Sequence, residues 1–314
     1  MVRTDVAGAA TALADYAVRL HGRRGRCVLV HRGCDPLWDF TADALRGRGF
    51  DVERVGLDER DRRWRPAAAW AGTGGGACLL VHHDPFGPVE NATGAETRDL
   101  RTLTDAGVSC LFVEFPHAVT GALGPAVAGA YYTMLEYSAD DVESLRSRWT
   151  AVLADADRIE IAVAGTTLTI RPPWTVHTDW SAMDVFPVLQ VPFGELWVVC
   201  DPKLVSGESI VQLGNDRYGK LRVVDGEATV DGTRLRGGLV ELGFGTNPAA
   251  LDPPTGSIAE KRLGRVHFGF GDSVFIGGDT SDASHSDLLL PRAAEVHAVT
   301  GDAVIPLRVS GGHD

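Results

Sequence analysis

The chain has 314 residues, which is enough to bury a large hydrophobic core and to form two domains. Its 44% of hydrophobic and 23% of charged residues are typical of a globular protein, and no apolar run reaches the length of a membrane span. The formal net charge of -12 argues against a nucleic-acid partner, because there is no excess of basic residues to neutralise phosphates. The N-terminus lacks the apolar segment of a signal peptide, so a cytoplasmic location is expected.

The first half of the sequence alternates between helical and apolar, strand-like segments. Helices are predicted over residues 5–21, 35–45, 92–106 and 140–154, and strands over residues 26–31, 50–55, 77–81 and 110–114. This alternation is typical of a parallel sheet covered by helices. No Gly-x-Gly-x-x-Gly motif follows the first strand, so the sequence does not indicate a dinucleotide site. We therefore predict an α/β domain over residues 1–155.

Histidines follow two of the predicted strands of this domain. His82 and His83 stand directly after the third strand, and His117 follows the fourth. Open α/β sheets commonly bind ligands at the carboxyl ends of their strands. His82 and His83 are therefore candidate catalytic groups that face a substrate. The alternative interpretation is that each is a turn histidine that faces solvent or caps a carbonyl group.

From Arg158 onward the pattern changes to that of β-structure. Residues 159–170 predict a hairpin with Ala164-Gly165 at its turn, and residues 196–200, 221–224 and 303–307 predict further strands. Residues 172–180 begin with two prolines and predict a rigid loop that carries His177 and Asp179 as a lid or a pocket wall. We predict a β-rich α+β domain over residues 156–314.

The stretch from Val240 to Leu290 contains residue types that commonly bind metal ions, each at the edge of a predicted glycine-rich turn. Carboxylates and imidazoles together suit divalent ions such as Zn, Mn, Fe and Co. Glycines let the backbone approach closely where such ligands converge. The alternative is a series of turns whose charged residues face water. The candidate ligands in this stretch are Glu241, Glu260, His267, His285 and Asp287.

Three motifs in this stretch resemble the C-terminal half of the aminopeptidase T and aminopeptidase S metallopeptidases. They are Glu-Leu-Gly-x-Gly-Thr-Asn-Pro from Glu241, Glu-Lys-x-Leu-Gly-x-Val-His from Glu260 and Ser-His-x-Asp from Ser284. The 2,5-dihydroxypyridine 5,6-dioxygenases are further relatives of the same fold. The resemblance extends upstream to Gly194-Glu195-Leu196 and covers most of the chain, although its N-terminal part is generic.

The resemblance implies a metallopeptidase with two divalent ions, Zn, Mn or Co. Two ions close together lower the pKa of a shared water molecule and polarise a carbonyl group, which is a hydrolytic arrangement. A carboxylate such as Glu241 could then move the proton. The main hypothesis is therefore a metal-dependent hydrolase that cleaves an amide or peptide bond. By motif, the six implied metal ligands are Glu195, Glu241, Glu260, His267, His285 and Asp287.

One position departs from the peptidase pattern. The peptidases carry a tyrosine, thought to stabilise an oxyanion, where this sequence has Val274. Another donor would have to replace it, and His177, His82 and His83 are the candidates. The resemblance also implies a homodimer and a small-molecule or short-peptide substrate.

The alternative hypothesis is a non-haem Fe(II) ring-cleaving dioxygenase. Two histidines and one carboxylate with open coordination positions are typical of such enzymes, and His267, His285 and Asp287 could supply them. His82, His83 or His177 would then act as acid or base over an aromatic substrate. Against this hypothesis, the other carboxylates would be anionic without an evident purpose, and a buried unpaired charge is costly. A third alternative is a metal-binding protein without catalytic activity.

Overall fold

The computed structural model describes residues 6–21, 25–32, 36–57, 77–83, 105, 107–114, 125–181, 188–214, 217–250, 257–282 and 284–309. The described elements form two compact units, and each is treated by itself. Among the described helices, none combines the length and the apolar character that a membrane crossing requires.

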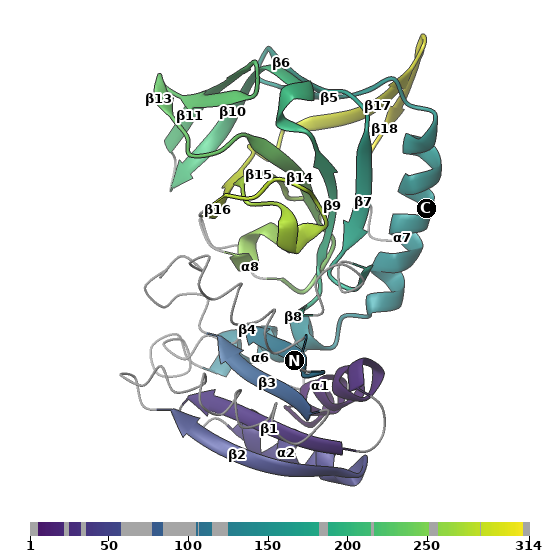
Figure 1. Ribbon diagram of the computed structural model, residues 1–314, viewed down its shortest axis with the longest axis vertical. Coiled ribbons are helices and arrows are strands. Elements are labelled where there is room, and N and C mark those ends of the chain that lie inside the picture. The colour runs from purple at the N-terminus through teal and green to yellow at the C-terminus, as the bar shows by residue number, and fades with distance from the viewer. Residues whose placement is uncertain are drawn as a thin grey trace. The chain divides into compact units, whose positions relative to one another are not determined.

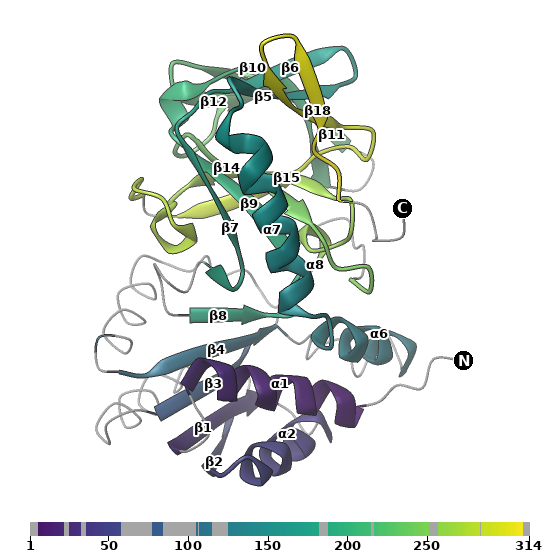
Figure 2. The same cartoon turned by 90° about the vertical axis from the view of Figure 1, so that its right-hand side faces the viewer.

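The first unit is built on a five-stranded sheet in which every strand pairs in parallel, in the order β2-β1-β3-β4-β8 (Figure 1). Helices α1 and α2 pack against each other beside this sheet (Figure 2). The elements are α1 (Val6–His21), β1 (Gly25–Arg32), α2 (Pro36–Gly47), β2 (Phe50–Leu57), β3 (Ala77–His83), β4 (Ser109–Glu114), α6 (Pro125–Leu135) and β8 (Val188–Val191).

The central strand β1 is buried on both faces, as is usual in a parallel sheet. In β1, Cys27, Val28, Leu29 and Val30 are all fully buried, as expected for a strand that has structure on both sides. The predicted helices at residues 5–21 and 35–45 and the four predicted strands are confirmed to within a few residues. Apart from Asp105, the helix predicted over residues 92–106 lies outside the described residues.

The fifth strand of this sheet comes from the later part of the sequence. Strand β8 pairs in parallel with β4 through Cys110 and Val188, although it belongs to the range predicted for the second domain. The two compact units accordingly divide the chain after Tyr137 and return residues 187–193 to the first unit. The mixed α/β character with a parallel sheet is confirmed, whereas a single domain boundary after residue 155 stays a prediction.

The second unit consists of two antiparallel sheets and helix α7 (Ala139–Ala154). One sheet has eight strands in the order β13-β12-β11-β10-β6-β5-β17-β18, and the other has five in the order β16-β15-β14-β9-β7. The remaining elements are β5 (Arg158–Val163), β6 (Thr166–Ile170), β7 (Trp174–Thr178), β9 (Glu195–Cys200), η2 (Pro202–Leu204), β10 (Val205–Gly214), β11 (Arg217–Val224), β12 (Glu227–Val230), β13 (Thr233–Arg234), β14 (Leu239–Gly245), α8 (Ser257–Glu260), β15 (Val266–Gly271), η3 (Val274–Ile276), β16 (His285–Leu289), β17 (Glu295–Thr300) and β18 (Ala303–Pro306).

Two expectations for this unit have different outcomes. The hairpin over residues 159–170 is confirmed, and Ala164 and Gly165 take positive φ values of 48° and 80° at its turn, as a two-residue turn of type I′ requires. The rigid loop predicted over residues 172–180 is wrong for most of its length. Residues Trp174–Thr178 form β7, whose pairing with β9 satisfies their backbone groups.

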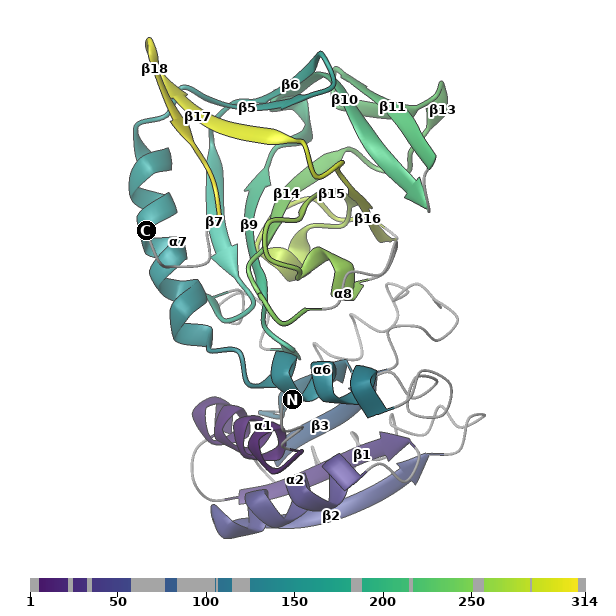
Figure 3. The ribbon, with the colours of Figure 1, turned by 180° about the vertical axis from the view of Figure 1, so that it is seen from behind.

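Helix α7 covers the apolar face of the five-stranded sheet. It runs beside β7, as Figure 3 shows from behind, and its Trp149 packs edge-on against Phe244 of β14, with ring centroids 4.4 Å apart. Every residue of β14 is buried, so this strand is covered on both faces. The face that α7 covers therefore forms the core, and the opposite face of the sheet carries the polar residues discussed next.

We expect Trp149→Ala to destabilise the second unit by about 3–5 kcal/mol, because it removes a buried indole and leaves a cavity against Phe244. Chemical denaturation followed by fluorescence and far-UV circular dichroism measures the effect. Val304→Ala, at an exposed position on β18, is the control and should change stability by less than about 0.5 kcal/mol. Equal stabilities of the two variants would contradict the core position of Trp149.

Candidate metal centre

The candidate ligands lie on one face of the five-stranded sheet. Strand pairing places Glu241 of β14 opposite Gly269 of β15, and Gly269 opposite Asp287 of β16. His267 of β15 is opposite Gly243 of β14. Side chains of directly opposed residues project from the same face of a sheet. The pairing therefore gathers residues from three neighbouring strands over a small area.

The glycine-rich turns predicted around these ligands are present at Gly264 and Gly277 but are wrong beside Glu241 and His267. Gly243, Gly245, Gly269 and Gly271 lie within strands β14 and β15. Their role in letting groups converge is nevertheless present, since a glycine in a strand marks a place where other groups approach closely. The sequence pattern identified the crowding but not the secondary structure that produces it.

The backbone of two of these glycines lies directly against the side chains of candidate ligands. A Cβ atom on Gly243 would lie 2.0 Å from Cε1 of His267, so the imidazole ring rests on the bare backbone of β14. A Cβ atom on Gly269 would lie 2.6 Å from Oε2 of Glu241 and 2.8 Å from Cε1 of His285. Only glycine fits at either position without displacing a candidate ligand.

Glu241 stands between the two histidines. Its Oε1 lies 3.4 Å from Nε2 of His267, and its Oε2 lies 3.2 Å from Nε2 of His285. The side chains of Glu241 and His267 are almost fully buried. One ligand atom each from Glu241, His267 and Asp287 lie within 4.8 Å of one another, which is close enough to hold one ion.

His285 is oriented by a backbone group. Its Nδ1 lies 2.6 Å from the carbonyl oxygen of Asp272, which can only accept, so Nδ1 carries the proton and donates. Its Nε2 then faces Asp287 Oδ1 at 3.1 Å. A hydrogen bond of this kind fixes the tautomer in which Nε2 is available to a metal ion. No sequence signal indicates the carbonyl of Asp272 as the partner.

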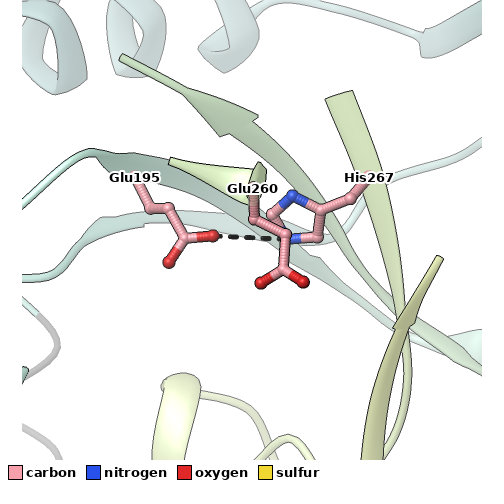
Figure 4. Close-up of side chains that lie close together, drawn as sticks. All are labelled: Glu195, Glu260 and His267. Carbon is pink, nitrogen blue, oxygen red and sulfur yellow. Dashed lines mark ion pairs between the residues drawn. The ribbon is translucent and has the colours of Figure 1, made fainter. Parts of the chain in front are cut away.

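A second acidic group shares His267. Ligand atoms of Glu195, Glu260 and His267 also lie within 4.8 Å of one another (Figure 4). Nε2 of His267 is 3.5 Å from Oε1 of Glu195. Glu260 is the last residue of α8, and the backbone around it crosses β14 at Gly245, where a Cβ atom would meet its carbonyl oxygen at 2.3 Å. All six predicted ligands therefore meet in one region.

Two further residues of this region were not predicted as part of it. Nζ of the buried Lys261 lies 3.1 Å from Oε2 of Glu195 and 3.4 Å from Oδ1 of Asp179. The other oxygen of Asp179 accepts hydrogen bonds from the backbone N–H groups of Gly194 and Glu195, both at 3.0 Å. The Glu-Lys motif contained Lys261, but nothing in its spacing indicated that the lysine points inward.

Burial and proximity shift the protonation equilibria of these residues strongly. Burial alone would raise the pKa of Glu241, but hydrogen bonding with His267 and His285 lowers it to about 2. Burial alone would lower the pKa of His267, but Glu241 and the other carboxylates raise it to about 10. Burial raises the pKa of Glu195 to about 7 although Lys261 opposes the shift, and burial together with Asp287 raises the pKa of Glu260 well above its usual value.

Of the histidines predicted to be catalytic, His177 is described by the structure and lies away from the candidate ligands. His177 lies on β7 in the same cross-strand row as Trp197, Gly243 and His267, so it is three strands, roughly 14 Å, from His267. Its ring stacks on Trp197 with centroids 6.4 Å apart, and its Nε2 is 2.8 Å from Oγ1 of Thr175. Its assignment as a catalytic group stays a prediction.

The catalytic role predicted for the histidines of the parallel sheet stays a prediction. His82 and His83 are the last two residues of β3, as the predicted position at the carboxyl end requires, but their side chains lie outside what the structure describes. His117 also lies outside the described residues.

The donor set fits a divalent metal ion. Two imidazoles and several carboxylates on one partly buried face are hard and borderline ligands, which suit Fe(II), Mn(II), Co(II) or Zn(II) and not a soft ion such as Cu(I). One imidazole already has its outer nitrogen fixed by a carbonyl group. Fold and face together define a mixed α/β protein with a candidate centre of histidine and carboxylate ligands on an antiparallel sheet.

Comparison with solved structures finds another protein with the same architecture. The chain resembles the 2,5-dihydroxypyridine dioxygenase of Pseudomonas putida KT2440 with a TM-score of 0.63 and 12% sequence identity, over 100% of this chain and 99% of that chain. At this identity the likeness establishes the fold. A match to YbdL of Escherichia coli, for which a methionine aminotransferase function is described, has a TM-score of 0.26, 17% identity, and covers 52% of this chain and 60% of that chain. The sequence matches no protein-family model and no curated protein.

We expect Gly243→Ala to weaken metal binding at least tenfold, because its Cβ would displace the ring of His267. Isothermal titration with Mn(II) measures the affinity, and circular dichroism checks the fold. Gly56→Ala in β2 is the matched control, since nothing lies within 4 Å of a Cβ there. An unchanged Mn(II) affinity in the folded Gly243→Ala variant would show that His267 is not a ligand.

Metal binding is expected to release protons near neutral pH. His267, with its pKa raised to about 10, is protonated at pH 7, and a metal ion must displace that proton. The apparent affinity should therefore rise with pH, by about tenfold per pH unit for each displaced proton, up to the pKa of the histidine. Titration with Zn(II) in buffers of different ionisation enthalpy counts the released protons. An affinity that is constant between about pH 6 and 8 would rule out a protonated ligand.

Proposed function

We propose that the chain is a mononuclear Fe(II)-dependent dioxygenase that cleaves a dihydroxylated aromatic ring. The observation that carries this proposal is the convergence of His267, His285 and Asp287 on one sheet face. Two histidines and one carboxylate with open positions are the ligand set of non-haem Fe(II) oxygenases. Such an ion, when bound, supplies the activation of dioxygen. The shared fold of the P. putida dioxygenase supports the same choice of chemistry.

The surroundings of the ligands suit an aromatic substrate. The ring of Phe275 in η3 stands edge-on to His285, with centroids 5.0 Å apart. Phe275 also packs against a buried cluster of Trp197, Val199 and Ile276, and the indole N–H of Trp197 donates to the carbonyl of Ile276 at 2.9 Å. In this proposal η3 keeps water from one side of the ligands and gives a planar substrate an aromatic surface to lie against.

His177 is the acid–base group of the proposal. Burial and the nearby Arg146 lower its pKa, so its imidazole is neutral at pH 7 and can accept a proton from a ring hydroxyl. Gly277 takes a φ of 99° next to it, and a Cβ atom there would lie 2.7 Å from the ring of His177. The glycine thus lets η3 end against the histidine.

The hydrolase remains the second candidate because of one specific observation. Glu195, Glu260 and His267 form an acidic group beside the first one, and two adjacent ions would have a hydrolytic use. The comparisons give no support to the aminopeptidase resemblance. Homodimer formation, the substrate class and the cytoplasmic location also remain predictions.

We expect oxygen uptake when the protein, loaded anaerobically with Fe(II), meets 2,5-dihydroxypyridine or a catechol in the presence of oxygen. Asp287→Asn should reduce the uptake on the order of 100-fold or more, because it removes a ligand charge. Asp302→Asn, in the exposed turn before β18, should leave the rate unchanged. An oxygen electrode and absorbance of the aromatic ring follow the reaction. Release of an amino acid from leucine amide without oxygen would favour the hydrolase instead.

A further inference from the structure

A buried lysine stands among the acidic residues of the candidate centre. The side chain of Lys261 is 1% exposed, and its ammonium group contacts Glu195 at 3.1 Å and Asp179 at 3.4 Å. Lysine is almost never fully buried unless it is paired, so this position is held by the carboxylates around it. None of the functions proposed above makes use of this lysine.

Glu195 bridges two positive partners. Its Oε1 points to Nε2 of His267 at 3.5 Å, and its Oε2 points to Nζ of Lys261 at 3.1 Å. A carboxylate with one oxygen toward each of two cations is also the arrangement that bridges two metal ions. Here the partner of Oε2 is an ammonium group of the chain itself, and the partner of Oε1 is His267.

The backbone is built to hold this lysine in place. A Cβ atom on Gly194 would lie 2.8 Å from the Cβ of Lys261, so the glycine before Glu195 makes room for the side chain. The carbonyl oxygen of Lys261 accepts a hydrogen bond from the N–H of Asn247 at 2.9 Å. Asp179 in turn holds the N–H groups of Gly194 and Glu195. The ammonium therefore occupies a fixed position and does not depend on a flexible surface chain.

We propose that the ammonium group of Lys261, paired with Glu195, keeps a second metal ion from binding among Glu195, Glu260 and His267, and so limits the centre to one ion. The inference rests on the proposed function, since it specifies how many ions the same centre binds. A second ion in this group would share the carboxylate of Glu195 with the ammonium, and the two positive charges would repel each other at short range. In this proposal Lys261 is the residue that separates one-ion from two-ion binding in this chain.

The test counts ions in the full-length protein. Wild type, Lys261→Met and Lys261→Arg are each saturated with Mn(II), desalted, and analysed by elemental mass spectrometry and by electron paramagnetic resonance. We expect one ion per chain and an uncoupled signal for the wild type and for Lys261→Arg, which keeps the charge. Lys261→Met should bind two ions with a spin-coupled signal. Lys220→Met, an exposed lysine on β11, is the matched control and should bind one ion.

Two ions in the wild type, or one ion in folded Lys261→Met, would overturn the proposal. If circular dichroism finds Lys261→Met unfolded, Lys261→Met/Asp179→Asn takes its place, because the amide still accepts from Gly194 and Glu195 while one buried charge is removed. Two ions in that variant support the proposal, and one ion overturns it. Oxygen uptake is recorded on the same samples. In the wild type, one ion without oxygen uptake would contradict the dioxygenase alone, and two ions with oxygen uptake would contradict the role of Lys261 alone.

Discussion

The contact between the ring of His267 and the bare backbone of Gly243 is the constraint on which the centre depends. Neighbouring strands of a sheet are about 4.8 Å apart, and their side chains normally fill the space above them. Glycines at alternate positions of β14 and β15 remove those side chains. The carboxylate and imidazole groups can then lie flat against the backbone of the neighbouring strand, where a side chain would otherwise block them. Helix α7 packs against the opposite face of the sheet. This packing stabilises the glycine-containing strands, which have few side chains on the ligand face.

Much of the backbone, and the set of residues that come together on the sheet face, could be predicted from the sequence. Helical periodicity indicated α1, α2 and α7, and apolar runs indicated β1 to β4, because those signals are local. The six carboxylate and imidazole residues were identified by motif, and they lie close together in the structure. The glycines beside Glu241 and His267 were assigned to turns although they lie in β14 and β15, because glycine usually marks a turn and its use inside a strand depends on which groups pack against it.

The partners of the ligands could not be predicted, because they are set by tertiary contacts. The inward direction of Lys261 follows from the room left by Gly194, which is 67 residues away in the sequence (261 − 194). The carbonyl of Asp272 orients His285 only because β15 and β16 are joined by a turn that brings it there. Asp179 was assigned to a loop, and its position just after β7 is what lets it bind the backbone of Gly194 and Glu195.

The late position of β8 in the sequence affects folding during synthesis. The parallel sheet takes its last strand from residues 188–191, after α7 and the strands β5 to β7 have already been synthesised. Until then β4 presents an unpaired row of N–H and C=O groups, and such an open edge readily joins another chain. The interval between β4 and β8 is therefore when a nascent molecule is most exposed to self-association. A chain truncated between β4 and β8 would keep the unpaired edge of β4 permanently.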